Sequence, residues 1–72
     1  MPKTRMVTLQ VAERSWLVKL KSYPTRCCLT SGWDIFAKEN SLRADDICVF
    51  ELIDMSDAVL RVSIFKHAQL NQ

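Results

Sequence analysis

Residues 19–26 read KLKSYPTR and combine cations, hydroxyls, one aromatic ring and a proline in eight positions. Lysine and arginine neutralise phosphates, hydroxyls donate to phosphate oxygens, and a guanidinium also forms a fork with the guanine edge in the major groove. Proline fixes its own φ and restricts the residue before it, which favours a stiff bend. The segment predicts a contact with double-stranded DNA, and the alternative is an ordinary solvated loop. The predicted contact residues are Lys19, Lys21, Ser22, Tyr23, Pro24, Thr25 and Arg26.

The other reactive side chains do not form a recognisable catalytic or metal-binding pattern. The single histidine, His67, lies near the C-terminus, far in sequence from the three cysteines. Zinc sites require Cys or His pairs at short spacings, which are absent here. The Asp45–Asp46 pair is typical of a turn, and one glycine, Gly32, cannot build a phosphate-binding glycine loop. We therefore predict no enzyme activity, no cofactor or metal, and no small-molecule substrate.

The charge distribution is uneven although the net charge is only +2. Residues 1–26 hold six of the ten Lys and Arg but one of the eight Asp and Glu. A basic half indicates a polyanionic partner. No apolar run approaches the length of a membrane helix, and no signal-peptide pattern follows the basic N-terminus, so we expect an intracellular protein without a membrane partner.

The hydrophobic periodicity predicts five short strands and one short helix. Period-two alternation is clearest where Trp16, Val18 and Leu20 face inward against outward lysines. Ser31 is expected to cap a helix that carries an apolar stripe of Trp33 and Phe36 and ends near Asn40. The predicted strands cover residues 6–11, 15–21, 26–30, 46–53 and 58–66. These strands cannot close a barrel by themselves, so we expect a partial, open barrel with exposed edges.

Three blocks carry a specific resemblance to a known family. They read WLVKL at 16–20, LTSGWDIF at 29–36 and ENSLRADDICVFEL at 39–52. Together these blocks resemble the plant B3 DNA-binding domain, most closely its reproductive-meristem (REM) branch. One departure is that the usual Gly-Asp turn reads Asp45-Asp46, which suggests that Asp45 adopts a left-handed φ.

The resemblance implies a seven-stranded open pseudobarrel with two short helices that grips the major groove between two arms. Residues 21–26 stand where the C-terminal arm would be, with Lys21 in place of an arginine. The strands, helix and arm at the start of a full domain have no match, so residues 1–72 are predicted to be the C-terminal portion of one B3 domain. The resemblance also implies a core of Trp16, Trp33, Phe36, Leu42 and Phe50.

Three functional hypotheses follow. The leading one is sequence-tolerant DNA binding in the nucleus by a truncated B3 transcription-factor domain, through the basic loop between the second and third strands in the major groove. The second is a protein-interaction module whose exposed sheet edge pairs with another β protein, such as another B3 protein, without useful DNA binding. The third is a chain with no stable fold, which would show no cooperative transition in urea.

Overall fold

The computed structural model describes residues 2–67, which form one curled sheet and one short helix. The elements in chain order are β1 (Lys3–Val11), β2 (Arg14–Ser22), β3 (Cys27–Leu29), α1 (Trp33–Glu39), β4 (Ile47–Asp54) and β5 (Val59–Phe65). This confirms the predicted mainly-β class with five strands and one helix. Within these residues no helix has the length and apolar character needed to cross a membrane.

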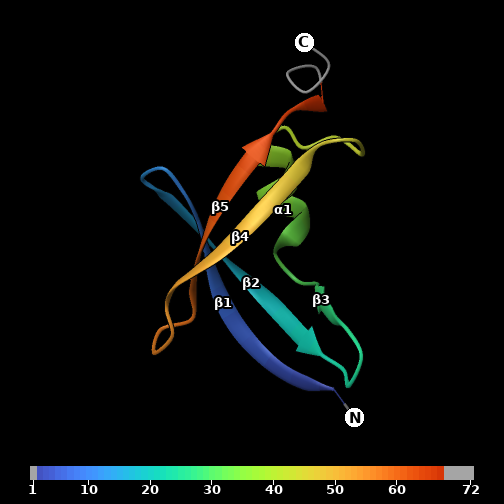
Figure 1. Ribbon diagram of the computed structural model, residues 1–72, viewed down its shortest axis with the longest axis vertical. Helices are drawn as coiled ribbons and strands as arrows, with labels where there is room; N and C mark the ends of the chain where they lie inside the picture. The colour runs from blue at the N-terminus through green and yellow to red at the C-terminus, as the bar shows by residue number, and fades with distance from the viewer. Residues whose placement is uncertain (1, 68–72) are drawn as a thin grey trace.

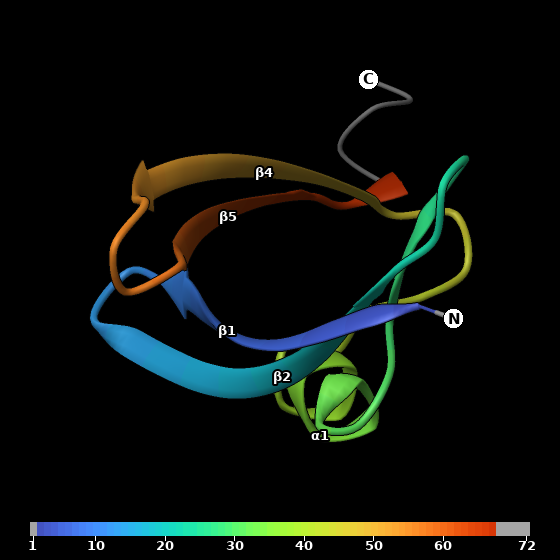
Figure 2. The same ribbon diagram turned by 90° about the horizontal axis from the view of Figure 1, so that it is seen from below.

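The five strands form a single sheet in the order β3-β2-β1-β5-β4. Neighbouring strands are antiparallel except for β1 and β5, which run parallel. The sheet bends so strongly that β4 and β5 lie across β1 and β2, giving an open half-barrel (Figures 1 and 2). The edges of this sheet are β3 and β4, as an unclosed barrel requires.

The core lies on one face of the sheet, called the inner face below. Val7 and Leu9 of β1, Val18 of β2 and Val62 of β5 are buried on it, and the alternate residues of these strands point to the outer face. The predicted inward alternation of β2 is confirmed, with Val18 fully buried and Trp16 and Leu20 packed against the core.

Helix α1 contributes Phe36, which is fully buried at the β2 side of the core. Its ring meets Trp16 edge-on and stacks with Trp33, both at a centroid distance of 5.1 Å. Glu39 at the end of the helix accepts hydrogen bonds from Arg14 (2.7 Å) and from Trp16 Nε1 (3.1 Å). These contacts fasten α1 to β2 (Figure 2).

The start of α1 differs from the prediction. The residue before the helix is Gly32, with φ of 94°, and no side chain caps the helix. Ser31 is exposed, and its carbonyl oxygen accepts from Lys19 N at 2.8 Å. The predicted Ser31 cap is therefore wrong, because a left-handed glycine turns the chain into the helix.

Strand β4 also differs from the prediction. Phe50, expected in the core, is 41% exposed. It pairs with Val62 and so points to the inner face, but β4 is an edge strand and Phe50 is not among the side chains that pack against the core. Asp45 also lacks the left-handed φ expected of it, which occurs instead at Ala12, Gly32, Ser41 and Ala58.

Candidate nucleic-acid interface

The predicted DNA-contact segment forms the end of the β2–β3 hairpin. Ser22 pairs with Cys27, and the next pair is closed by a hydrogen bond from Tyr23 N to Arg26 O of 2.8 Å. Pro24 and Thr25 are therefore left as an exposed two-residue turn. The hairpin tip (residues 23–26) projects at the end of the molecule where β1 begins (Figure 1).

The cations of this segment share the outer face of the sheet. Lys19 and Lys21 alternate with the inward Val18 and Leu20, so they point outward. Arg26 follows the same register, since it stands opposite Tyr23, two residues beyond Lys21. Arg26 and Lys21 thus lie on one face of the hairpin.

Local contacts orient Arg26 and fix the backbone at Lys19. The Arg26 guanidinium carbon lies 5.0 Å from the centroid of the Tyr23 ring, a cation–π arrangement that orients the guanidinium. The Lys19 carbonyl accepts from Thr30 N at 2.8 Å and from Thr30 Oγ1 at 3.3 Å. Within residues 2–67, Lys19, Lys21 and Arg26 form no ion pair, so their charges are available to a partner.

Ser22 is the predicted contact residue that the structure separates from the lysines. It alternates with Lys21 and so belongs to the inner face, where its Oγ accepts from Cys27 Sγ at 3.7 Å. A contact of Ser22 with DNA thus requires a partner that reaches the inner face of the hairpin.

Sequence reasoning missed the beginning of β1, which lies beside the hairpin. Lys3 pairs with Ser22 and Thr4 pairs with Lys21. Lys3, Ser22, Tyr23 and Pro24 line a shallow hollow of about 280 Å³. The available signal was the spacing of Lys3 and Arg5, which extends the two-residue period of Val7 and Leu9 toward the N-terminus.

Comparison with known proteins decides the family. The family model for the B3 DNA binding domain matches residues 1–68. The chain belongs to the B3 family.

Curated B3 proteins of plants are similar to this domain. It is 38% identical over 60 residues to the B3 domain-containing transcription factor VRN1 of Arabidopsis thaliana, covering 83% of this chain and 18% of that protein. It is 30% identical over 61 residues to the B3 domain-containing protein REM16 of the same plant, covering 82% and 18%. A putative B3 domain-containing protein of Oryza sativa, Os03g0621600, is 39% identical over 59 residues, covering 81% and 6%.

The chain thus spans less than a fifth of these relatives. The similarity to REM16 agrees with the REM branch that the sequence motifs indicate.

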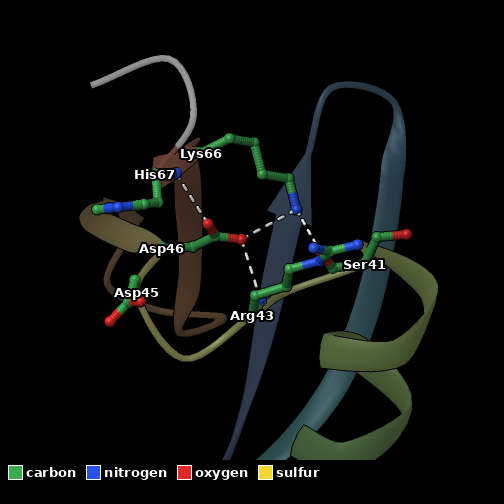
Figure 3. Close-up of a pocket in the computed structure, with 6 residues that line it drawn as sticks. All are labelled: Ser41, Arg43, Asp45, Asp46, Lys66 and His67. Atoms are coloured by element: carbon green, nitrogen blue, oxygen red, sulfur yellow. Dashed lines mark hydrogen bonds and ion pairs between the residues drawn. The ribbon is translucent and has the colours of Figure 1, made fainter. Parts of the chain in front are cut away.

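A second polar cluster in this B3 domain surrounds Asp46, whose side chain is only 3% exposed (Figure 3). Its carboxylate accepts from Arg43 N at 3.0 Å, from His67 N at 2.9 Å and from Lys66 Nζ at 3.1 Å. Lys66 Nζ also donates to the carbonyl oxygens of Asn40 and Ser41. The cluster therefore joins the α1–β4 loop to the end of β5, a structural role.

The same contacts stabilise the charged form of Asp46. The backbone N–H of His67, then that of Arg43, and then Lys66 lower the pKa of Asp46 from 3.8 to about 2. An acid held so far below neutral pH is unsuited to proton transfer there. The nearby Cys48 thiol is also a poor nucleophile, because burial and the Asp46 charge raise its pKa.

Acid is expected to weaken the fold through Asp46. Because its pKa is lowered in the folded state, its contribution is complete above pH 3.8 and is lost as the pH falls toward about 2. Urea unfolding of the wild type should therefore show a declining free energy across this interval. At pH 6, Asp46→Asn should have a lower free energy of unfolding than the wild type. On acidification, its free energy of unfolding should fall by less than that of the wild type. Equal acid sensitivity of the two proteins would contradict the assignment.

Proposed function

We propose that this B3 domain binds double-stranded DNA in the nucleus, with the tip of the β2–β3 hairpin in the major groove. The supporting observation is the set of cations on the outer face of this hairpin, which have no ion-pair partner within residues 2–67. The residues assigned to the contact are Lys19, Lys21, Ser22, Tyr23, Pro24, Thr25 and Arg26.

The chemistry divides these residues by role. Lys19 and Lys21 present charge to phosphates, a contact that gives affinity without sequence information. Arg26 is the candidate for reading a base edge, since a guanidinium held against an aromatic ring loses little freedom when it forms a bidentate contact with guanine. Thr25 at the exposed turn can donate to a phosphate oxygen, and Pro24 limits the conformations that the turn must lose on binding.

The salt dependence of binding tests this proposal. Each neutralised phosphate contributes about −0.9 to the slope of log K against log salt concentration. The double variant Lys21→Gln/Arg26→Gln should therefore bind a duplex roughly tenfold or more weakly at low salt, and the loss of the Lys21 phosphate contact should make the slope shallower by about 0.9. Fluorescence anisotropy with a labelled duplex measures both quantities.

A matched control removes the same charge elsewhere. Lys38 on α1 and Arg43 in the α1–β4 loop are exposed and lie outside the hairpin. Lys38→Gln/Arg43→Gln should keep a slope close to that of the wild type. If the two double variants weaken binding equally, net charge and not the hairpin governs the interaction, and the proposal fails.

The second candidate function is pairing of the exposed β4 edge with another β protein, including another B3 protein. The observation behind it is the exposure of Ile47, Val49, Phe50 and Leu52 on this edge strand. The family match supports DNA binding in preference to it. Sedimentation equilibrium of the chain alone would detect pairing between copies.

A further inference from the structure

The inner face of the hairpin end carries a cation of its own. The register of β1 on β2 is continuous from Val11↔Arg14 to Lys3↔Ser22. Because side chains alternate along a strand, Lys3 shares the face of the buried Val7 and Leu9. Lys3 therefore points away from the face that carries Lys19 and Lys21.

Lys3 is available to a partner, whereas its neighbour Arg5 is engaged. Arg5 Nη2 donates to the Met55 carbonyl oxygen at 3.2 Å, across the half-barrel. Lys3 is exposed and forms no ion pair within residues 2–67. It lines the hollow of about 280 Å³ together with Ser22, Tyr23 and Pro24, and Ser22, its partner in the β1–β2 register, supplies a hydroxyl that can donate.

We propose that Lys3 and Ser22 form a second phosphate-binding site on the inner face of the hairpin. The sheet end then enters the major groove tip first, with its outer face toward one DNA strand and its inner face toward the other. This inference rests on the proposed function. It adds a contact residue outside the basic loop and explains how Ser22, which points away from the lysines, reaches the duplex.

The dimensions of the two molecules permit this arrangement. The major groove is about 12 Å wide and admits a two-stranded β-ribbon. A sheet with side chains on both faces occupies about 10 Å, the usual spacing of stacked sheets. Cations on opposite faces then meet opposite walls of the groove. A sheet lying flat against the duplex would instead leave Lys3 and Ser22 in solvent.

Salt titrations of single variants test the second site. Lys3→Gln should bind a duplex more weakly and reduce the salt slope by about 0.9, and Lys3→Arg should restore both because a phosphate contact requires charge alone. Ser22→Ala should weaken binding with an unchanged slope, since a neutral hydroxyl displaces no counterion. Unfolding in urea should show that each variant retains the wild-type transition.

The cysteines at the hairpin provide a second readout that does not depend on charge. Cys27 is exposed and stands opposite Ser22 on the inner face, whereas Cys28 stands opposite Lys21 on the outer face. In a Cys28→Ser/Cys48→Ser variant, tip-first binding predicts that a saturating duplex slows alkylation of Cys27 by N-ethylmaleimide.

The outcomes separate the two proposals. If Lys21→Gln/Arg26→Gln weakens binding but Lys3→Gln keeps the wild-type slope and Cys27 stays reactive, the sheet lies flat and the second site is refuted while the proposed function stands. If neither Lys21→Gln/Arg26→Gln nor Lys3→Gln changes the affinity, the proposed function itself fails.

Discussion

Gly32→Ala is expected to destabilise the domain by about 3 kcal/mol or more, a large part of the roughly 5–15 kcal/mol that holds a small domain together. Gly32 has φ of 94°, which side chains with a Cβ rarely adopt. A Cβ built there lies 2.5 Å from the Leu17 carbonyl oxygen and 3.3 Å from Val18 Cα. Both belong to the backbone of β2, next to the fully buried Val18, so neither can yield without disturbing the sheet.

Ser31→Ala is the matched control for this glycine. Ser31 is exposed, and its contact with β2 is made by its carbonyl oxygen, which the substitution preserves. The change in unfolding free energy should stay within about 0.5 kcal/mol. Urea denaturation followed by circular dichroism measures both variants. If Gly32→Ala is as stable as the wild type, the start of α1 does not approach β2 as closely as described.

Phe36→Ala should lower the free energy of unfolding by about 3–5 kcal/mol, the usual range for removing a buried aromatic side chain. Phe36 is fully buried and contacts both tryptophans, Trp16 of β2 and Trp33 of its own helix. Its removal therefore leaves a cavity at the junction of α1 with the sheet. Fluorescence should report the loss directly, since both tryptophans of the chain border that cavity.

Ile35→Ala is the control for this substitution, because Ile35 adjoins Phe36 in α1 but is 54% exposed. Ile35→Ala should lower the free energy of unfolding by less than about 1 kcal/mol and should leave the tryptophan emission unchanged. If Phe36→Ala and Ile35→Ala lower the free energy of unfolding by similar amounts, α1 does not pack on the sheet through Phe36.

The local elements could be predicted because their signals are local. Trp16, Val18 and Leu20 alternate with polar residues strictly enough to define the inner face of β2. Trp33 and Phe36 stand one helical turn apart and indicate the stripe that packs on the sheet. The strand order, including the parallel pairing of β1 with β5, depends on contacts between residues about fifty positions apart, and no local pattern encodes it.

The wrong predictions for Ser31 and Phe50 also have tertiary causes, which no local pattern in the sequence encodes. Ser31 matches a capping pattern, but the turn is set by the close approach of Gly32 to Leu17, a tertiary contact. Phe50 belongs to a strongly apolar strand, but burial depends on what covers that strand, and β4 lies at an edge. The predicted strand began at residue 6, three positions after the start of β1, so the place of Lys3 in the sheet was not predicted.

The hairpin residues could be predicted as a basic loop, but not as two opposed faces. Composition indicated charge, hydroxyls and a bend between residues 19 and 26. The separation of Ser22 from Lys21 follows from strand alternation once the register with β3 is known. The position of Lys3 beside that end follows only from the pairing of β1 with β2.

The most direct test of the central claim is a two-dimensional amide NMR titration of the isotope-labelled chain with a short duplex. If the hairpin binds the duplex, the largest shift changes fall on residues 19–28 and on the beginning of β1, with little change along β4. Changes concentrated on residues 47–54, with the hairpin amides unmoved, would contradict it.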